Sequence, residues 1–229
     1  MENFIIFASM KQIEPIAHFR SPLTSKFGIP RQSGLVEELR GRIVFEEPYN
    51  HPEALRGIEG FDYLWLIWGF SENDSAAQAP LTVRPPRLGG NKRMGVFATR
   101  SPFRPNGLGL SCVRVDRVEQ GVIHVLGADL MDGTPIYDVK PYIPYADAHP
   151  DARAGFTDDT EWKQLEVDFP DDLRRHFSAE EQTALVSILS LDPRPHYHAD
   201  PQRIYGMPFA GRDIRFRVSE NTVYVVEIV

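Results

Sequence analysis

Apolar and polar residues alternate along several short segments of the first 130 residues, which is the pattern of β-strands with one buried face. One helical turn is expected between them, because Asn50 and Pro52 are typical of the start of a helix and Gly57 is typical of its end. Strands that follow strands at short spacing favour an antiparallel barrel or sandwich over a fold of alternating strands and helices. The expected strands are residues 13–19, 42–46, 61–70, 94–99, 110–116 and 123–126.

The sequence between residues 61 and 121 predicts three further features. The segment 61–70 is apolar on both faces, so we expect a central strand that is covered on both sides. Gln120-Gly121 predicts the turn of a hairpin between the last two strands. Residues 82–92 contain Pro85-Pro86 and Gly89-Gly90, which indicates a loop.

The pattern changes after Pro150. Residues 151–159 are polar and acidic, as in a linker. Ser178 and Glu181 then form a capping box that opens a helix, and two strands follow at 213–219 and 222–229. We therefore expect a mainly β protein, with an antiparallel β-barrel domain over residues 1–150 and a small α+β domain over residues 151–229.

Charge is unevenly distributed along the chain. The net charge of −7 argues against binding nucleic acid through bulk charge, yet no acidic residue occurs between Asp74 and Asp116. A basic stripe in that interval can guide a polyanion to one place, although a solvated face that pairs with acids from other segments has the same composition. The stripe consists of Arg84, Arg87, Lys92, Arg93, Arg100, Arg104 and Arg114.

Several classes of protein are disfavoured. No apolar run reaches the roughly 20 residues of a membrane helix, and residues 4–8 are too short for a signal peptide. The single cysteine, Cys112, stands beside Val113 and Val115, so we expect a buried thiol and a cytoplasmic protein. Dinucleotide and phosphate-loop motifs are absent, and His196 and His198 have no evident third ligand, so we expect no metal site.

Two proline-rich segments hold the candidate chemistry. In residues 100–111, prolines 102 and 105 fix the backbone around Arg100 and Arg104, which indicates a rigid cationic loop at the rim of the sheet. Residues 129–142 hold three aspartates, a lysine and two tyrosines around the turn at Asp132-Gly133. This segment is either a structural turn with incidental charges or the floor of a polar pocket whose wall is the 100–111 loop.

Four motifs resemble the TsaA-like, TrmO-type tRNA methyltransferases: Pro30-Arg31-Gln32, residues 82–91, residues 95–106, and residues 132–135 with 138–142. The resemblance covers residues 13–150, and residues 194–195, 203–207 and 209–211 resemble the C-terminal extension of that family. It implies a homodimeric β-barrel enzyme that uses S-adenosylmethionine. The implied reaction is N6-methylation of threonylcarbamoyladenosine next to the anticodon of tRNA.

The resemblance also implies which residues bind the cofactor. These are Pro30, Arg31, Gln32, Arg100, Leu110, Asp129, Leu130, Met131, Asp132, Gly133 and Thr134, with Ser71 and Glu72 where close relatives carry His-Gln. A carboxylate such as Asp129 or Asp132 suits the ammonium group or the ribose hydroxyls of the cofactor.

For the substrate, an arginine fork can clamp the threonyl carboxylate, and we nominate Arg104 with Arg31 second. Asn106 and Lys140 are expected nearby, and Arg84, Arg87 and Arg93 are expected to contact tRNA. Asp138 or Tyr142 is expected to accept the N6 proton. Two alternatives stay open: an RNA-binding barrel without enzymatic activity, and a methyltransferase of this fold with another acceptor.

Overall fold

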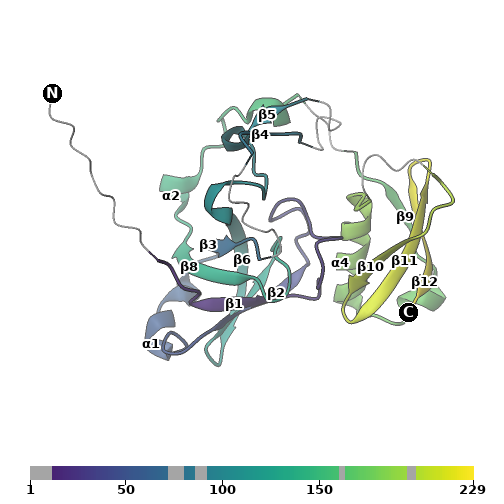
Figure 1. Cartoon of the computed structure of the whole chain (residues 1–229). Helices are drawn as coiled ribbons and strands as arrows, with labels where there is room; N and C mark the ends of the chain where they lie inside the picture. The colour runs from purple at the N-terminus through teal and green to yellow at the C-terminus, as the bar shows by residue number, and fades with distance from the viewer. Residues whose placement is uncertain (1–11, 72–79, 86–91, 160–162, 195–199) are drawn as a thin grey trace, which may run out of the picture.

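The computed structural model describes residues 12–71, 80–85, 92–159, 163–194 and 200–229 (Figure 1). Strands predominate in this part of the chain, and most of them pair antiparallel, which confirms the expected mainly β class.

Six strands form a sheet that closes on itself (Figure 1). In ring order they are β1 (Ala17–Arg20), β2 (Arg40–Phe45), β7 (Val122–Leu126), β6 (Leu108–Glu119), β3 (Tyr63–Gly69) and β8 (Pro135–Pro141). All six pairings are antiparallel, and β8 returns to β1 with Ala17 opposite Ile136. The ring therefore leaves no strand edge unpaired along its seam.

Side-chain alternation fills the interior of the ring. Leu64, Leu66 and Trp68 of β3 point inward, where they join the buried Ile43 and Ile136. Burial of each such leucine or isoleucine side chain, relative to leaving it exposed, stabilises the fold by about 1.5–3 kcal/mol.

The opposite side of β3 forms part of the outer surface, where Tyr63 is 42% exposed. The expectation that this strand is covered on both faces is therefore wrong. Its outer residues are apolar because Trp65 and Tyr63 pack against the ring of Tyr142 at the end of β8, with centroids 5.9 and 6.0 Å apart.

Two local predictions have different outcomes. The hairpin between β6 and β7 turns at Gln120 and Gly121, both with positive φ, as predicted. Residues 94–99 are not one strand: β5 (Met94–Gly95) pairs with β4 (Thr82–Val83), and Val96–Ala98 is a 3-10 turn. The pairing with β4 also means that the expected loop at 82–92 begins as a strand.

The other helical elements are short, apart from one. They are α1 (Pro52–Leu55), α2 (Pro144–Asp147), α3 (Asp171–Arg174), α4 (Ala179–Ser190) and the 3-10 turns Ile58–Gly60, Pro105–Gly107 and Gly155–Thr157. Helix α4 begins at the predicted capping box: Ser178 Oγ accepts from the Glu181 N–H at 3.2 Å, and the Glu181 carboxylate accepts from the Ser178 N–H at 2.8 Å.

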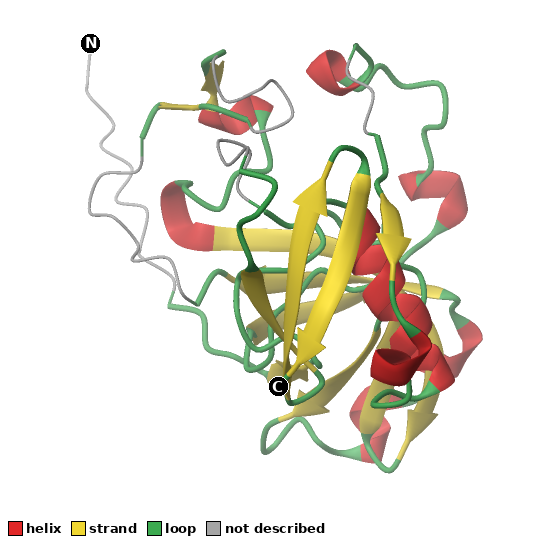
Figure 2. Cartoon of the chain, turned by 90° about the vertical axis from the view of Figure 1, so that its right-hand side faces the viewer, coloured by secondary structure: helices red, strands yellow, loops and turns green. Residues whose placement is uncertain are grey.

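Helix α4 lies beside a second, four-stranded sheet, which faces the viewer in Figure 2. Its order is β10 (Tyr205–Phe209), β11 (Arg212–Ser219), β12 (Thr222–Ile228) and β9 (Glu166–Asp168), with β9 parallel to β12.

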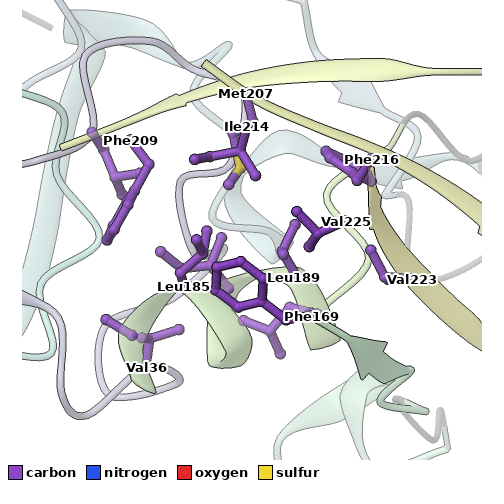
Figure 3. Close-up of a cluster of buried hydrophobic side chains, with 14 of the residues drawn as sticks. Val36, Phe169, Leu185, Leu189, Met207, Phe209, Ile214, Phe216, Val223 and Val225 are labelled. Carbon is purple, nitrogen blue, oxygen red and sulfur yellow. The ribbon is translucent and has the colours of Figure 1, made fainter. Parts of the chain in front are cut away.

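The core between α4 and this sheet also receives side chains from the N-terminal half. Figure 3 shows Val36 beside Leu185 and Leu189, below Phe209 and Met207 of the sheet. Leu23 and Leu39 are buried in the same cluster. The connection between β1 and β2 is therefore packed into the C-terminal core.

Candidate functional site

Segments that are far apart in sequence meet at the start of β6. The Arg100 guanidinium donates to Gln32 Oε1, and the backbone N–H of Cys112 donates to Ser33 Oγ at 3.2 Å. The loop around residue 32 is thereby fixed to the 100–112 segment.

A chain of side-chain hydrogen bonds continues from the ring interior to the connection between β7 and β8. The indole N–H of Trp68 donates to Ser111 Oγ at 2.9 Å, and the Ser111 hydroxyl donates to Asp129 Oδ1 at 2.5 Å. Gly109 makes room for the indole, because a Cβ there would lie 2.3 Å from the Trp68 ring. We call Gln32, Ser33, Arg100, Ser111 and Asp129 the Asp129 cluster.

Burial raises the pKa of the Asp129 carboxyl above its ordinary value. The hydrogen bond from Ser111, backbone N–H groups of Asp129 and Ser33, and the positive charge of Arg100 act in the opposite direction. A carboxylate that has lost part of its hydration gains more from a bound ammonium or hydroxyl than a fully hydrated one does. This donor set therefore fits the polar groups of an amino acid or a ribose.

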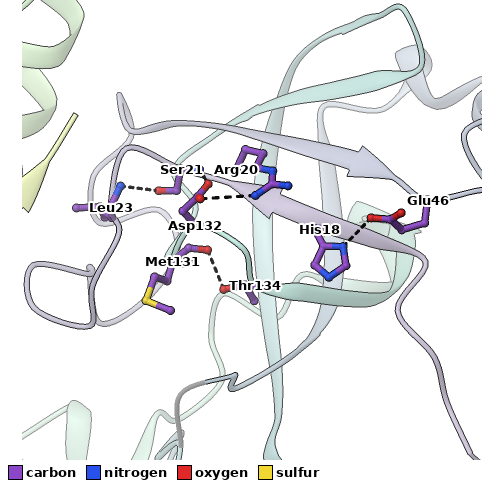
Figure 4. A network of polar contacts seen from close by, with 8 residues as sticks. All are labelled: His18, Arg20, Ser21, Leu23, Glu46, Met131, Asp132 and Thr134. Atoms are coloured by element: carbon purple, nitrogen blue, oxygen red, sulfur yellow. Dashed lines mark hydrogen bonds and ion pairs between the residues drawn. The ribbon is translucent and has the colours of Figure 1, made fainter. Parts of the chain in front are cut away.

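Asp132, at the other end of the same turn, faces a different part of the fold (Figure 4). Its carboxylate accepts from the Ser21 N–H at 3.0 Å and lies 3.6 Å from the Arg20 guanidinium. Its own N–H donates to the Leu23 carbonyl at 2.8 Å. The structure thus uses Asp132 to fix the chain that follows β1, and no contact of Asp132 with Arg100 is found among the described residues.

The rest of the turn is held by the fold itself. Thr134 is buried, and its hydroxyl donates to the Met131 carbonyl at 2.8 Å (Figure 4). Leu130 is buried in the ring core, and the Gly133 N–H donates to the Phe19 carbonyl at 2.8 Å. Pro30 is likewise buried, and Arg31 is half-buried.

The loop before β6 is ordered by hydrogen bonds of its own. The Arg104 guanidinium donates to the Thr99 carbonyl at 3.1 Å, and the Phe70 N–H donates to the Gly107 carbonyl at 2.9 Å. Asn106 is exposed with φ 66°. Arg104 is therefore half-buried and braced within the loop that follows Arg100.

Asp138 and Lys140 lie together on the outer surface of β8, with Asp138 Oδ2 and Lys140 Nζ 2.9 Å apart. Asp138 stands opposite Ile67 of β3, and Ile67 stands opposite Leu110 of β6. At a spacing of about 4.8 Å between strands, Asp138 and Leu110 are about 10 Å apart on one surface. Leu110 is 56% exposed there, whereas its neighbour Ser111 points inward.

A second polar group on this surface was not predicted. Asp147 in α2 accepts from the Trp65 indole at 3.0 Å and from the Ile143 N–H at 2.9 Å, and these bonds lower its pKa, that from Ile143 more strongly. The signal was an acidic residue in the first turn after Pro144, near the N–H groups that the start of a helix leaves without a partner.

Cys112 is only partly buried on this outer surface, so the expectation of a core thiol is wrong. The apolar residues beside it in sequence point to the opposite face of β6. Burial and the charge of Asp147 raise the pKa of its thiol.

The basic stripe is partly described. Arg84 and Arg93 are exposed at the ends of β4 and β5, next to the pair Val83 and Met94. Ser71 is exposed at the end of β3. The predicted Glu72 and Arg87, and the histidines 196 and 198, lie outside the described residues.

Two kinds of feature are absent from the described ranges. No group of three or more histidine, cysteine or acidic side chains is close enough together to hold a metal ion. None of the helices there has the length and apolar character that are needed to cross a membrane.

Two family models match the chain: the tRNA-methyltransferase O N-terminal domain over residues 18–148 and the TrmO C-terminal domain over residues 162–229. The chain is 40% identical over 221 residues to the tRNA (adenine(37)-N6)-methyltransferase of Escherichia coli, covering 91% of this chain and 94% of that protein. The enzyme of the same name from Eikenella corrodens is 42% identical over 169 residues, covering 72% and 95%.

Solved structures agree with this assignment. The crystal structure of TrmO from Pseudomonas aeruginosa superposes with a TM-score of 0.78 at 32% identity, covering 96% of this chain and 99% of that one. Full-length matches in sequence and structure, together with both family models, lead to one conclusion: this chain belongs to the TrmO family of tRNA methyltransferases.

Proposed function

We propose that this protein transfers a methyl group from S-adenosylmethionine to N6 of adenine 37 in the anticodon loop of tRNA. The supporting observation is the Asp129 cluster, which gathers a desolvated carboxylate, an arginine and an amide in a chain that is 40% identical to an enzyme of that name. We further propose that the adenine carries a threonylcarbamoyl group.

The residues of the cluster suit S-adenosylmethionine. That cofactor, when bound, supplies a methyl group on a positively charged sulfur. We propose that Asp129 accepts hydrogen bonds from its ammonium or hydroxyl groups, while Gln32 and Arg100 complete the polar wall and Leu110 offers an apolar surface. Asp132 is a structural residue in this proposal, because its carboxylate is already engaged by Ser21 and Arg20.

The remaining nominated cofactor residues have a supporting role. Leu130, Met131, Gly133 and Thr134 hold Asp129 in place through the buried turn. Pro30, Arg31, Ser71 and Glu72 stay nominated on the resemblance alone.

Arg104 is the proposed clamp for the threonyl carboxylate of the substrate. Its guanidinium is braced by the Thr99 carbonyl, which leaves other N–H groups for a planar carboxylate. Asn106 and Lys140 are proposed neighbours of the same group. Arg84 and Arg93, exposed on β4 and β5, are proposed to contact tRNA phosphates, with Arg87 of the same stripe.

Asp138 is the preferred acceptor of the N6 proton. It lies on the same outer surface as Leu110, and its exposed carboxylate has one ionic partner, Lys140, among the described residues. Tyr142 is the weaker candidate, because its ring is packed against Trp65 and Tyr63 farther along that surface.

We also propose a homodimer. Phe97, Phe103 and Leu110 are 77%, 58% and 56% exposed around the start of β6. Exposed large apolar side chains are suited to burial against a second copy, and a two-fold interface at Leu110 would lie close to the proposed cofactor sites.

In the same proposal, the closed sheet within residues 1–150 is the catalytic β-barrel domain, and residues 151–229 form a smaller domain that supports it. We propose that the enzyme acts in the cytoplasm, where its tRNA substrate is found.

The test is methylation of tRNA taken from cells that lack this protein, followed by nucleoside mass spectrometry. Methylated threonylcarbamoyladenosine is expected with the wild-type protein and S-adenosylmethionine. Asp129→Asn is expected to lose most of this product, whereas Asp168→Asn, an exposed carboxylate on β9, keeps it. Binding of tRNA without stabilisation by S-adenosylmethionine in a thermal melt would instead identify a non-enzymatic RNA-binding protein.

A further inference from the structure

A cleft of about 400 Å³ lies on the outer surface of β1, β2, β6 and β7. Four of its eleven lining residues are arginines, and no member of the Asp129 cluster lines it. Figure 4 shows one wall, where Arg20 and Ser21 meet Asp132.

Strand pairing arranges the basic side chains of the cleft in a row. Arg20 stands opposite Arg42, Arg42 stands opposite His124, and His124 stands opposite Arg117. Side chains at such facing positions are about 5 Å apart at their Cβ atoms, and like charges there are destabilising. Three guanidinium groups and an imidazole are therefore crowded across four strands.

Acidic residues compensate only the ends of the row. Arg20 lies 3.6 Å from Asp132, and Arg117 lies 2.7 Å from Asp116 and 3.3 Å from Glu119. The arginine in the middle of the row, Arg42, has no ion pair or hydrogen bond from its guanidinium to any described residue, and its side chain is exposed.

The surroundings of His124 agree with an excess of positive charge at the centre. Burial lowers its pKa most, Arg117 and Arg42 lower it further, and Glu119 and Asp116 oppose them. Arg40 adds a fourth guanidinium at the rim, 3.8 Å from both Asp116 and Glu180.

We propose that this cleft binds a phosphate group of the tRNA backbone, centred on Arg42, as a contact separate from the methyl-transfer site. The inference rests on the proposed function, because it takes tRNA as the substrate. Arg42 has no anionic partner among the described residues and stands between Arg20 and the imidazole of His124, so its guanidinium is suited to bind a phosphate through charge-assisted and bidentate hydrogen bonds.

The position of the cleft suits a strand that also enters the methyl-transfer site. One turn connects the two places: Asp129 belongs to the cluster, and Asp132 belongs to the wall of the cleft. Three residues of chain span at most about 11 Å between Cα atoms. A single RNA strand can therefore touch both.

The C-terminal part of the chain borders the cleft as well. Glu180 of α4 faces Arg40, and the Ala210 N–H donates to the Pro22 carbonyl at 2.9 Å. The first contact holds the side chain of Arg40, and the second fixes the segment that follows Arg20, so both shape the cleft although they supply no cation.

The test compares Arg42→Ala with Arg56→Ala, which removes the same charge from an exposed side chain at the end of α1, outside the cleft. Affinity for tRNA is measured over a series of salt concentrations. Arg42→Ala is expected to weaken binding about tenfold and to reduce the slope of log K against log salt by roughly 0.7–0.9, the loss of one phosphate contact.

Further measurements distinguish a loss of tRNA binding from a loss of folding and from a slower methyl-transfer step. Arg42→Ala is expected to keep its thermal stabilisation by S-adenosylmethionine, with the loss of activity in the KM for tRNA and not in kcat. Arg42→Lys is expected to recover most of the salt slope, because it restores the charge without the fork.

Different failures have different meanings. If the wild-type protein methylates tRNA and Arg42→Ala matches it in affinity and salt slope, the cleft is not a tRNA contact and the proposed function stands. If the wild-type protein neither binds nor methylates tRNA, the proposed function itself is wrong. If inorganic phosphate stabilises the wild-type protein but not Arg42→Ala, while tRNA binding is equal in both, the cleft serves a small phosphate ligand and the assignment to RNA is overturned.

Discussion

The hydroxyl of Ser111 donates a hydrogen bond of 2.5 Å to the carboxylate of Asp129, so an inner residue of β6 orients the acid of the proposed cofactor site. Because Trp68 donates to the same hydroxyl oxygen, the serine proton is directed toward the aspartate. The site is thus organised from inside the ring before any ligand arrives.

Replacing this serine is expected to affect stability and binding together. Ser111→Ala leaves the buried Trp68 N–H without its acceptor, which costs about 1–3 kcal/mol in the free energy of unfolding. Denaturant titration and calorimetric binding of S-adenosylmethionine measure the two effects. Ser187→Ala, which removes an exposed hydroxyl, serves as the control. Unchanged cofactor affinity in Ser111→Ala would separate the hydrogen bond from the site.

The pKa of Asp129 predicts a dependence of stability on pH. Because burial raises this pKa in the folded protein, the folded state holds its proton to higher pH than the unfolded state. The contribution of Asp129 to the free energy of unfolding therefore falls as pH rises from the ordinary value of 3.8 through the raised one. Asp129→Asn is expected to remove this fall, and to lose none of the stability of the wild-type protein at neutral pH.

The same substitution is expected to weaken binding of S-adenosylmethionine at least about tenfold, since a charge-assisted hydrogen bond is worth roughly 1.5–3 kcal/mol. Unfolding curves and binding isotherms over a pH series check both effects, with Asp168→Asn as the control. A wild-type affinity that does not decline in acid would argue against an ionised Asp129 in the complex.

Arg104→Lys tests the proposed clamp on the threonyl carboxylate. Lysine keeps the charge but lacks the planar fork, so kcat/KM for threonylcarbamoylated tRNA is expected to fall roughly 10- to 100-fold. The comparison uses Arg153→Lys, which changes an exposed arginine in the segment before β9. Equal turnover by Arg104→Lys and the wild-type enzyme would assign the carboxylate to another residue.

Gly109→Ala tests the space that the fold gives to Trp68. The new methyl group would lie 2.3 Å from the indole, so the ring or the strand has to move, at a cost of about 1–3 kcal/mol. Gly95→Ala places a methyl group in open space at a negative φ and is expected to be near neutral. Chemical denaturation measures both, and equal stability of the two variants would contradict the packing seen here.

Leu110→Lys tests the proposed dimer. A charge at the centre of an apolar interface is expected to shift the protein toward monomer in sedimentation experiments. Ile204→Lys puts the same charge on another exposed apolar residue of the described chain and is expected to leave the association state unchanged. A wild-type protein that sediments as a monomer at all concentrations would remove this part of the proposal.

Local features were predictable where a few adjacent residues determine them. Gln120 and Gly121 specify the hairpin turn by their backbone conformations, and Ser178 with Glu181 specifies the start of α4. Residues 135–141 were not recognised as a strand because prolines stand at both ends, although a proline is compatible with the first position of a strand.

The features that depend on distant contacts were not predictable. Asp129 and Asp132 look equivalent in sequence, and only the fold turns one toward Ser111 and the other toward Ser21. Ser111 itself reads as an ordinary strand residue, since nothing nearby in sequence indicates the buried indole that it accepts from.

The burial of Val36 and Leu39 in the C-terminal core has a practical consequence for anyone who shortens this protein. A fragment that stops after Pro150 would leave these side chains exposed to water. It would also free the connection between β1 and β2, which holds Gln32 against Arg100. Such a fragment is expected to retain strand pairing yet bind its methyl donor poorly. Residues 151–229 are therefore expected to brace the proposed cofactor site, and a shortened protein has to keep them or replace their packing against Val36 and Leu39.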